Sequence, residues 1–156
     1  MIPQTKYKVF MNDGTVTVLS VPATTGTIEQ SKWYAKNIDT ILSYSTVTND
    51  AEISDRTFRN AWEANQSRDG IKVNMTKARD IHMDKIRIMR DKKLDQLDVD
   101  YMRAQEQGNT TLINEIIAEK DRLRDLPATF DLSVAGSATE LKALWPSNLD
   151  KHYIYS

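Results

Sequence analysis

The strongest constraint on this chain is the stretch from Asn74 to Pro127, which has the pattern of two long, charged, amphipathic helices joined by a short turn. The first helix is predicted from its cap at Thr76 to about Gln107, because apolar residues recur there at helical spacing. Those residues are Ala78, Ile81, Ile88, Leu94, Leu97, Tyr101 and Ala104. Gly108 can end this helix in the left-handed conformation, and so short a connection predicts that the second helix packs antiparallel to the first.

The second helix is predicted to begin at the caps offered by residues 109–111 and to end at Pro127. Its apolar stripe consists of Leu112, Ile113, Ile116, Ile117 and Leu123. At 1.5 Å per residue the first helix would be about 48 Å long, whereas the radius of gyration of a compact chain of this size is about 15 Å. We therefore expect the first helix to project, to bend or to lie along another surface, with any break near the acidic residues 95–100.

The N-terminal half has the alternation and the turn signals of β-hairpins. Residues 6–21 form the first predicted hairpin, and residues 12–14, Asn-Asp-Gly, supply a turn that tolerates positive φ. Residues 41–48 are rich in Thr, Ile, Val and Tyr and predict a further strand. Residues 57–64 and 71–75 predict the two strands of a second hairpin, separated by a polar loop.

Large aromatic residues predict core positions, and capping signals predict two short helices. Phe58 and Trp62 are expected to anchor the core of the second hairpin. Thr27 and Gln30 have the spacing of a capping box and predict a short helix, whose buried face would include Trp33 and Tyr34. A second capping box at residues 137–140 opens a short helix that Pro146 ends, before an aromatic tail.

The pattern as a whole predicts an α+β fold. We expect a β-rich region of two hairpins and a short helix at residues 1–75, an antiparallel helical hairpin at 76–127, and a small closing helix with the aromatic tail at 128–156. These segments would form one domain with a projecting hairpin, because 156 residues are typical of a single domain.

Composition narrows the classes of function. The net charge is −1 with acidic and basic residues interleaved, which argues against a nucleic-acid partner. The sequence has no cysteine, so disulfides, thiolate chemistry and cysteine-ligated metals are excluded. We expect no membrane partner, because no apolar run approaches 18 residues, and no signal peptide, because Met1 to Lys6 has no apolar core. These features predict a protein made and used in a cytoplasm, or carried out of one by lysis or within a particle.

No constellation of residues points to catalysis. His82 lies between Asp80 and Asp84, but residues two apart on a helix point in different directions and would not converge on a metal ion. We therefore expect His82 to be a helix-surface residue and His152 a surface or contact residue. Neither a phosphate-binding loop nor a nucleophile elbow is present. The sequence predicts a protein that is not an enzyme and has no metal or other cofactor.

Three segments together resemble small proteins encoded in the tail modules of tailed bacteriophages. The first consists of residues 3–10, Pro-Gln-Thr-Lys-Tyr-Lys-Val-Phe, followed by 13–16. The second consists of residues 55–63, Asp-Arg-Thr-Phe-Arg-Asn-Ala-Trp-Glu, and leads through 72–82. The third consists of residues 94–108, which end Tyr-Met-Arg-Ala-Gln-Glu-Gln-Gly, then 123–125 and 140–146, Glu-Leu-Lys-Ala-Leu-Trp-Pro. The match is collinear over nearly the whole chain. The departures are the polar loop at 66–69 and the aromatic extension after Pro146. The family is described only as tail, tail-fibre-associated or tail-assembly proteins and implies no catalytic residues.

The resemblance implies two alternative roles. The protein would be a structural component of the virion tail, made in the bacterial cytoplasm, that links the tail tip or baseplate to the fibre. Alternatively, it would be a cytoplasmic chaperone of fibre assembly that is absent from the mature virion. The apolar stripes could pack on each other and on the β-rich region, which needs no partner, or part of them could face another protein or a second copy of the chain, as in a homo-oligomer. The predicted partner-contact residues are Ile113, Ile117, Leu123, Trp145, Tyr153 and Tyr155.

Overall fold

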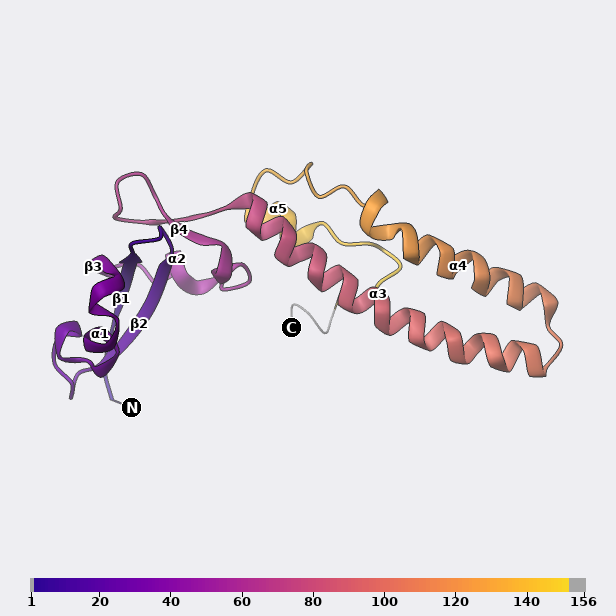
Figure 1. The fold of residues 1–156 in the computed structure, drawn as a ribbon, viewed down its shortest axis with the longest axis horizontal. Helices are drawn as coiled ribbons and strands as arrows, with labels where there is room; N and C mark the ends of the chain where they lie inside the picture. The colour runs from indigo at the N-terminus through magenta and orange to yellow at the C-terminus, as the bar shows by residue number, and fades with distance from the viewer. Residues whose placement is uncertain (1, 152–156) are drawn as a thin grey trace. The chain divides into compact units, whose positions relative to one another are not determined.

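The computed structural model describes residues 2–151 and has an α+β fold, with antiparallel strands in its N-terminal half and long helices in its C-terminal half (Figure 1). This confirms the predicted fold class. The chain divides into two compact units, with the division between Asn74 and Met75. The segment after the helical hairpin therefore belongs to the same unit as the hairpin itself.

The N-terminal unit is built on a three-stranded antiparallel sheet of order β2-β1-β3. Its strands are β1 (Gln4–Met11), β2 (Val16–Pro22) and β3 (Ile41–Thr46). The predicted first hairpin is confirmed, and its turn places Gly14 at a φ of 85°, a conformation that costs glycine little. β3 pairs with β1 on the side away from β2, which the sequence alone did not establish.

Apolar clusters cover both faces of this sheet. On one face Val9, Val21 and Ile28 are buried against η1 (Ile28–Gln30) and α1 (Lys32–Asn37), and Trp33 and Tyr34 of α1 are half-buried there. The capping box holds, because the Thr27 amide donates to Oε1 of Gln30 at 2.9 Å. η2 (Ile38–Thr40) follows and leads into β3.

The opposite face packs against the second hairpin. Phe10 and Val16 are buried there with Ile53 of α2 (Ala51–Ser54) and with Trp62. The strands of this hairpin are β4 (Trp62–Ala64) and β5 (Ile71–Val73). Trp62 therefore anchors the core as predicted.

The predicted strand at residues 57–64 is only half correct. Its first part is a turn followed by η3 (Arg59–Ala61), in which the Ala61 amide donates to the Phe58 carbonyl at 2.8 Å. The turn is started by Asp55, whose side chain accepts a hydrogen bond from the Thr57 amide at 3.0 Å. The alternation of Phe58 and Trp62 thus arises from a tight turn that buries both rings, and not from a continuous strand.

The C-terminal unit is dominated by two antiparallel helices, α3 (Met75–Glu106) and α4 (Thr110–Thr129), which lie side by side in Figure 1. α3 is continuous through residues 95–100, so the possible break there does not occur. Gly108 has a φ of 64° at the turn, and the Asn109 side chain accepts from the Leu112 amide at 3.1 Å, as a C-cap and an N-cap should.

Pro127 does not end the second helix, contrary to the prediction. It lies inside α4, which continues to Thr129, and the Phe130 amide still donates to the Leu126 carbonyl at 2.9 Å. Pro127 removes only its own amide hydrogen bond, and a proline this close to a helix end disturbs few others. The start of α3 also differs from the prediction by one residue, because Met75 precedes the expected cap at Thr76.

The segment after α4 returns along α3 and forms α5 (Ala138–Ala143), which lies beside the first half of α3 in Figure 1. Arg79 of α3 fixes this return by donating to the Leu132 carbonyl at 3.2 Å and to the Ala135 carbonyl at 2.9 Å. The predicted capping box opens α5, with the Glu140 amide donating to Ser137 Oγ at 3.2 Å. Leu141 of α5 is fully buried.

Candidate protein interface

The helical hairpin is the candidate site. Side chains buried in its seam, the contact between α3 and α4, cannot contact a partner. Ala104 of α3 faces the seam and is fully buried, as is Leu123 of α4, and Ile116 is nearly so. Leu123 was predicted to contact a partner, but its side chain is 0% exposed. In this fold Leu123 therefore stabilises the hairpin and presents nothing to a second protein.

Ion pairs across the seam hold the two helices in register. Lys120 of α4 pairs with Asp98 of α3, and its ammonium group lies 5.7 Å from the centre of the Tyr101 ring. On the other side of the hairpin, Lys93 Nζ lies 3.2 Å from Oε1 of Glu119. Because the two pairs bridge opposite sides of the seam, they resist sliding of one helix along the other.

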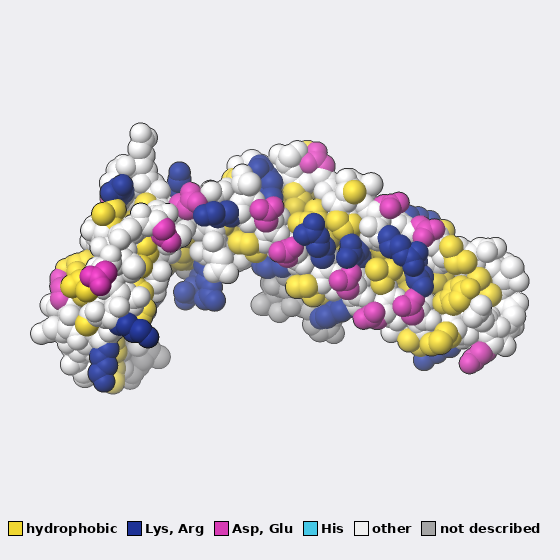
Figure 2. All heavy atoms as spheres, viewed as in Figure 1, with side chains coloured by type: hydrophobic (Ala, Val, Ile, Leu, Met, Phe, Trp, Pro, Cys, Tyr) yellow, Lys and Arg dark blue, Asp and Glu magenta, His cyan; other side chains and the backbone are white. Residues whose placement is uncertain are grey.

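One side of the hairpin tip carries the apolar side chains that the sequence singled out. Ile113, Ile117 and Lys120 are four and then three residues apart, so they project from the same side of α4. Lys120 reaches Tyr101, which places that ring on the same side. Figure 2 shows hydrophobic side chains gathered near the tip, bordered by charged ones. We call Tyr101, Ile113 and Ile117, with Asp98 and Lys120, the tip face.

The tip face is accessible in part. Ile117 is 42% exposed and Ile113 is half-buried, so of the predicted contact residues these two are brought together at a surface. Three further exposed apolar residues near the tip were not predicted: Val99, Met102 and Leu112. Met102 is 56% exposed and lies outside the apolar stripe of α3, and that departure from helical spacing was the signal available in the sequence.

Trp145 has an internal role, which the prediction of a partner contact did not anticipate. Its ring lies edge-on to the ring of His82 with centroids 5.5 Å apart, and its Nε1 donates to the Leu149 carbonyl at 3.0 Å. The side chain is half-buried. Trp145 therefore ties the C-terminal segment to α3.

His82 is not a surface residue, contrary to the prediction. It is 0% exposed, and its Nε2 donates to the Leu144 carbonyl across a distance of 2.7 Å. Burial lowers the pKa of His82, the Leu144 hydrogen bond opposes this, and the nearby charges of Lys85 and Lys151 lower it further. The imidazole is thus a neutral core group that joins α3 to the residues after α5.

The C-terminal segment also contacts the hairpin through Asn148. Lys93 Nζ donates to the Asn148 carbonyl at 2.6 Å, and the Asn148 amide donates to Oε1 of Glu119 at 3.2 Å. Partial burial by itself raises the pKa of Glu119, but the bonds from Asn148 and Lys93 outweigh this and lower it. The remaining predicted contacts, Tyr153 and Tyr155, and His152 lie outside the described residues.

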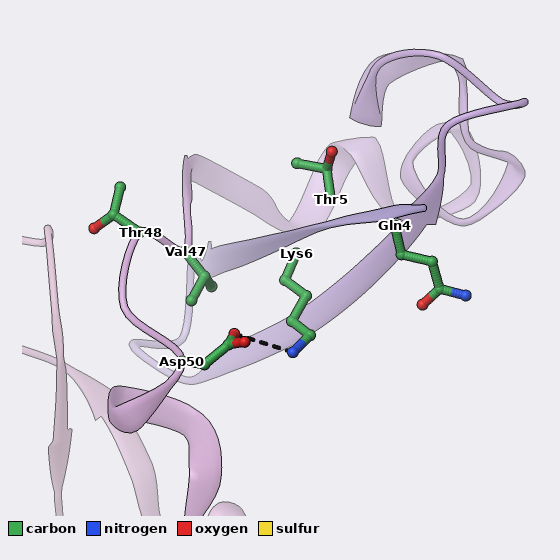
Figure 3. Close-up of a pocket in the computed structure, with 6 residues that line it drawn as sticks. All are labelled: Gln4, Thr5, Lys6, Val47, Thr48 and Asp50. Atoms are coloured by element: carbon green, nitrogen blue, oxygen red, sulfur yellow. Dashed lines mark hydrogen bonds and ion pairs between the residues drawn. The ribbon is translucent and has the colours of Figure 1, made fainter. Parts of the chain in front are cut away.

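One hollow of the N-terminal unit is lined mainly by polar residues. The hollow in Figure 3 has a volume of about 360 Å³ and is lined by residues of β1 and by the segment after β3. Its charged groups neutralise each other, because Lys6 Nζ lies 3.0 Å from Oδ1 of Asp50. This hollow offers polar contacts and an internal charge pair.

No group of three or more His, Cys, Asp or Glu side chains is placed to hold a metal ion within residues 2–151. Over the same residues, none of the helices is both long enough and apolar enough to span a membrane.

Comparison with known proteins identifies no relative: no family model, no curated protein and no solved structure matches this chain.

Proposed function

We propose that this chain is a non-enzymatic structural protein of a bacteriophage tail, which links the tail tip or baseplate to the fibre. The observation that carries the proposal is the tip face, where Ile113 and Ile117 form an apolar surface that the chain itself leaves partly uncovered. The resemblance of three sequence segments to tail-module proteins supports the phage context. No observation favours an enzymatic role over this one.

The physical basis of the contact is burial of the tip face by another protein. Fully burying an exposed Ile side chain contributes roughly 1.5–3 kcal/mol, and covering the exposed parts of Ile113 and Ile117 contributes a fraction of this value for each. Asp98 and Lys120 border the apolar residues, and charges at the rim of an interface select the orientation and the partner. An adaptor needs this combination of a small apolar centre and a charged border.

The first experiment asks whether the protein is part of the particle. Quantitative mass spectrometry of purified virions should detect it as a stoichiometric component, in a copy number that is a multiple of three or six. If it is absent from virions and instead co-purifies with fibre from lysates, the chaperone alternative replaces the adaptor role. If free protein forms a stable homo-oligomer through the tip face, the occupant of that face is a second copy.

A matched pair of variants tests the tip face itself. Ile117→Asp places a carboxylate where a partner should bury an apolar group, and we expect incorporation into particles to fall at least tenfold. Ile88→Asp is the control, because Ile88 is a similarly exposed isoleucine of α3 that is not part of the tip face. Equal incorporation of the two variants would contradict the proposed contact.

A further inference from the structure

Two arginines of the N-terminal unit line one small hollow together. The hollow has a volume of about 200 Å³, and its walls include Arg56, Arg59 and Asn60, the edge of Trp62, and residues 16–18 of β2. Arg56 and Arg59 are brought together by a turn, because the Arg59 amide donates to the Arg56 carbonyl at 3.1 Å. Residues three apart in such a tight turn project from the same side of the chain.

Neither guanidinium group is neutralised within the part of the chain that the structure describes. No carboxylate lines the hollow, and among residues 2–151 the structure gives no hydrogen bond or ion pair to the side chain of Arg56 or Arg59. The nearest acidic residue in sequence, Asp55, uses its side chain to accept from the Thr57 amide. Two exposed guanidinium groups therefore line the hollow and are accessible to an anion.

The arginines of the C-terminal unit, unlike Arg56 and Arg59, all have a partner among the described residues. Each of them forms an ion pair with a carboxylate or donates to a backbone carbonyl: Arg79, Arg87, Arg90, Arg103, Arg122 and Arg124. Guanidinium groups recognise planar carboxylates by paired hydrogen bonds, and arginine beside tryptophan is the composition of interface hot spots.

We propose that Arg56 and Arg59 bind a carboxylate of an acidic protein segment, with Asn60 as an additional hydrogen-bond donor and Trp62 as the apolar wall. The size of the hollow suits one such group. A nucleic-acid backbone would require a longer basic track to neutralise successive phosphates, and the chain has a net charge of −1. This site lies in the N-terminal unit and does not depend on the function proposed for the hairpin.

The test is a titration of the full chain with the acidic peptide Ac-Ala-Glu-Glu-Ala-NH₂, followed by NMR of the arginine Nε–H groups and the tryptophan indoles. We expect saturable shifts at Arg56, Arg59 and Trp62, with a Kd on the order of 1 mM for so small a probe. Arg68 is the internal control, because it is an exposed arginine of the same unit that does not line the hollow.

Variants make the test specific. The double variant Arg56→Gln with Arg59→Gln should weaken peptide binding at least tenfold, and Arg68→Gln should leave it unchanged. Both replaced side chains are exposed, so the fold should survive; substitution of the pair by lysine, which keeps the charge but loses the paired geometry, should give intermediate binding. Unsaturable shifts that are equal at Arg59 and Arg68 would overturn the proposal. Tighter binding of a single-stranded oligonucleotide than of the peptide would overturn it as well.

Discussion

The two units of this protein differ in how their charged side chains are paired and buried. In the C-terminal unit several charged groups are paired along and across two helices, and the buried ring of His82 is held by a backbone carbonyl. In the N-terminal unit a lysine, Lys8, is buried between sheet and loop, whereas Arg56 and Arg59 are exposed and have no side-chain partner among the described residues. The C-terminal unit thus presents an apolar patch at the hairpin tip, and the N-terminal unit presents two arginines that line a hollow.

Leu123→Ala should cause the largest loss of stability, and it tests whether the two units unfold separately. The fully buried leucine lies in the seam of the hairpin, and truncating such a residue costs about 3 kcal/mol. We expect the loss in the unfolding transition of the C-terminal unit, measured by chemical denaturation, with the N-terminal transition unchanged. Ile117→Ala is the control and should cost less than about 1 kcal/mol. An equal loss in both transitions would show that the units unfold together.

Lys8→Ala tests the buried charge of the N-terminal unit. Lys8 Nζ lies 2.9 Å from Oε2 of Glu52 and donates to the Asp69 carbonyl at 2.8 Å. Its removal leaves both acceptors without this donor, so we expect a loss of about 2 kcal/mol in the free energy of unfolding. Lys6→Ala breaks the exposed pair with Asp50 and should cost at most about 1 kcal/mol. Similar losses for the two variants would refute a special role for Lys8.

The pH dependence of stability should come from His82 in the range just below neutrality. Because burial lowers its pKa in the folded protein, the unfolded chain binds the proton first as the pH falls below about 6.5. Stability contributed by neutral His82 is therefore complete above that pH and declines below it, by up to about 1.4 kcal/mol per pH unit. His82→Gln should remove this decline between pH 6.5 and 5 in denaturation curves. A variant with an unchanged slope would contradict the assignment.

Lys120→Ala should have the smallest effect on stability. The lysine pairs with the exposed carboxylate of Asp98, so its loss should cost roughly 0.5–1 kcal/mol. Because the pair borders the tip face, the same variant should change partner selectivity more than stability. Denaturation and competition for incorporation into particles measure the two effects separately, and a loss as large as that of Leu123→Ala would contradict this view.

Local signals in the sequence were enough to predict the elements, but not how they pack. The helical hairpin follows from apolar spacing and from Gly108, and the first β-hairpin follows from the turn at Gly14. The pairing of β3 with β1 depends on contacts between distant residues, which no local pattern encodes. Pro127 was taken as a helix end because its position within the last turn could not be read from composition.

The candidate interface was predictable only in part. Ile113, Ile117 and Leu123 were predicted as contacts because they belong to the apolar stripe of the second helix, but the seam of the hairpin covers Leu123 completely. His82 is buried because Leu144 and Trp145 pack against α3. The aspartates that flank His82 in the sequence predict an exposed position, so its burial could not be predicted locally. The hollow at Arg56 and Arg59 was missed because its turn was read as a strand.

The most direct test of the central claim uses the absence of cysteine from the chain. Ile117→Cys introduces a single thiol on the tip face, and its rate of reaction with a maleimide can be compared between free protein and purified particles. The account predicts rapid labelling of the free protein and protection in the particle, with Ile88→Cys labelled in both. Equal labelling of Ile117→Cys in both states would contradict the claim that another protein covers the tip face.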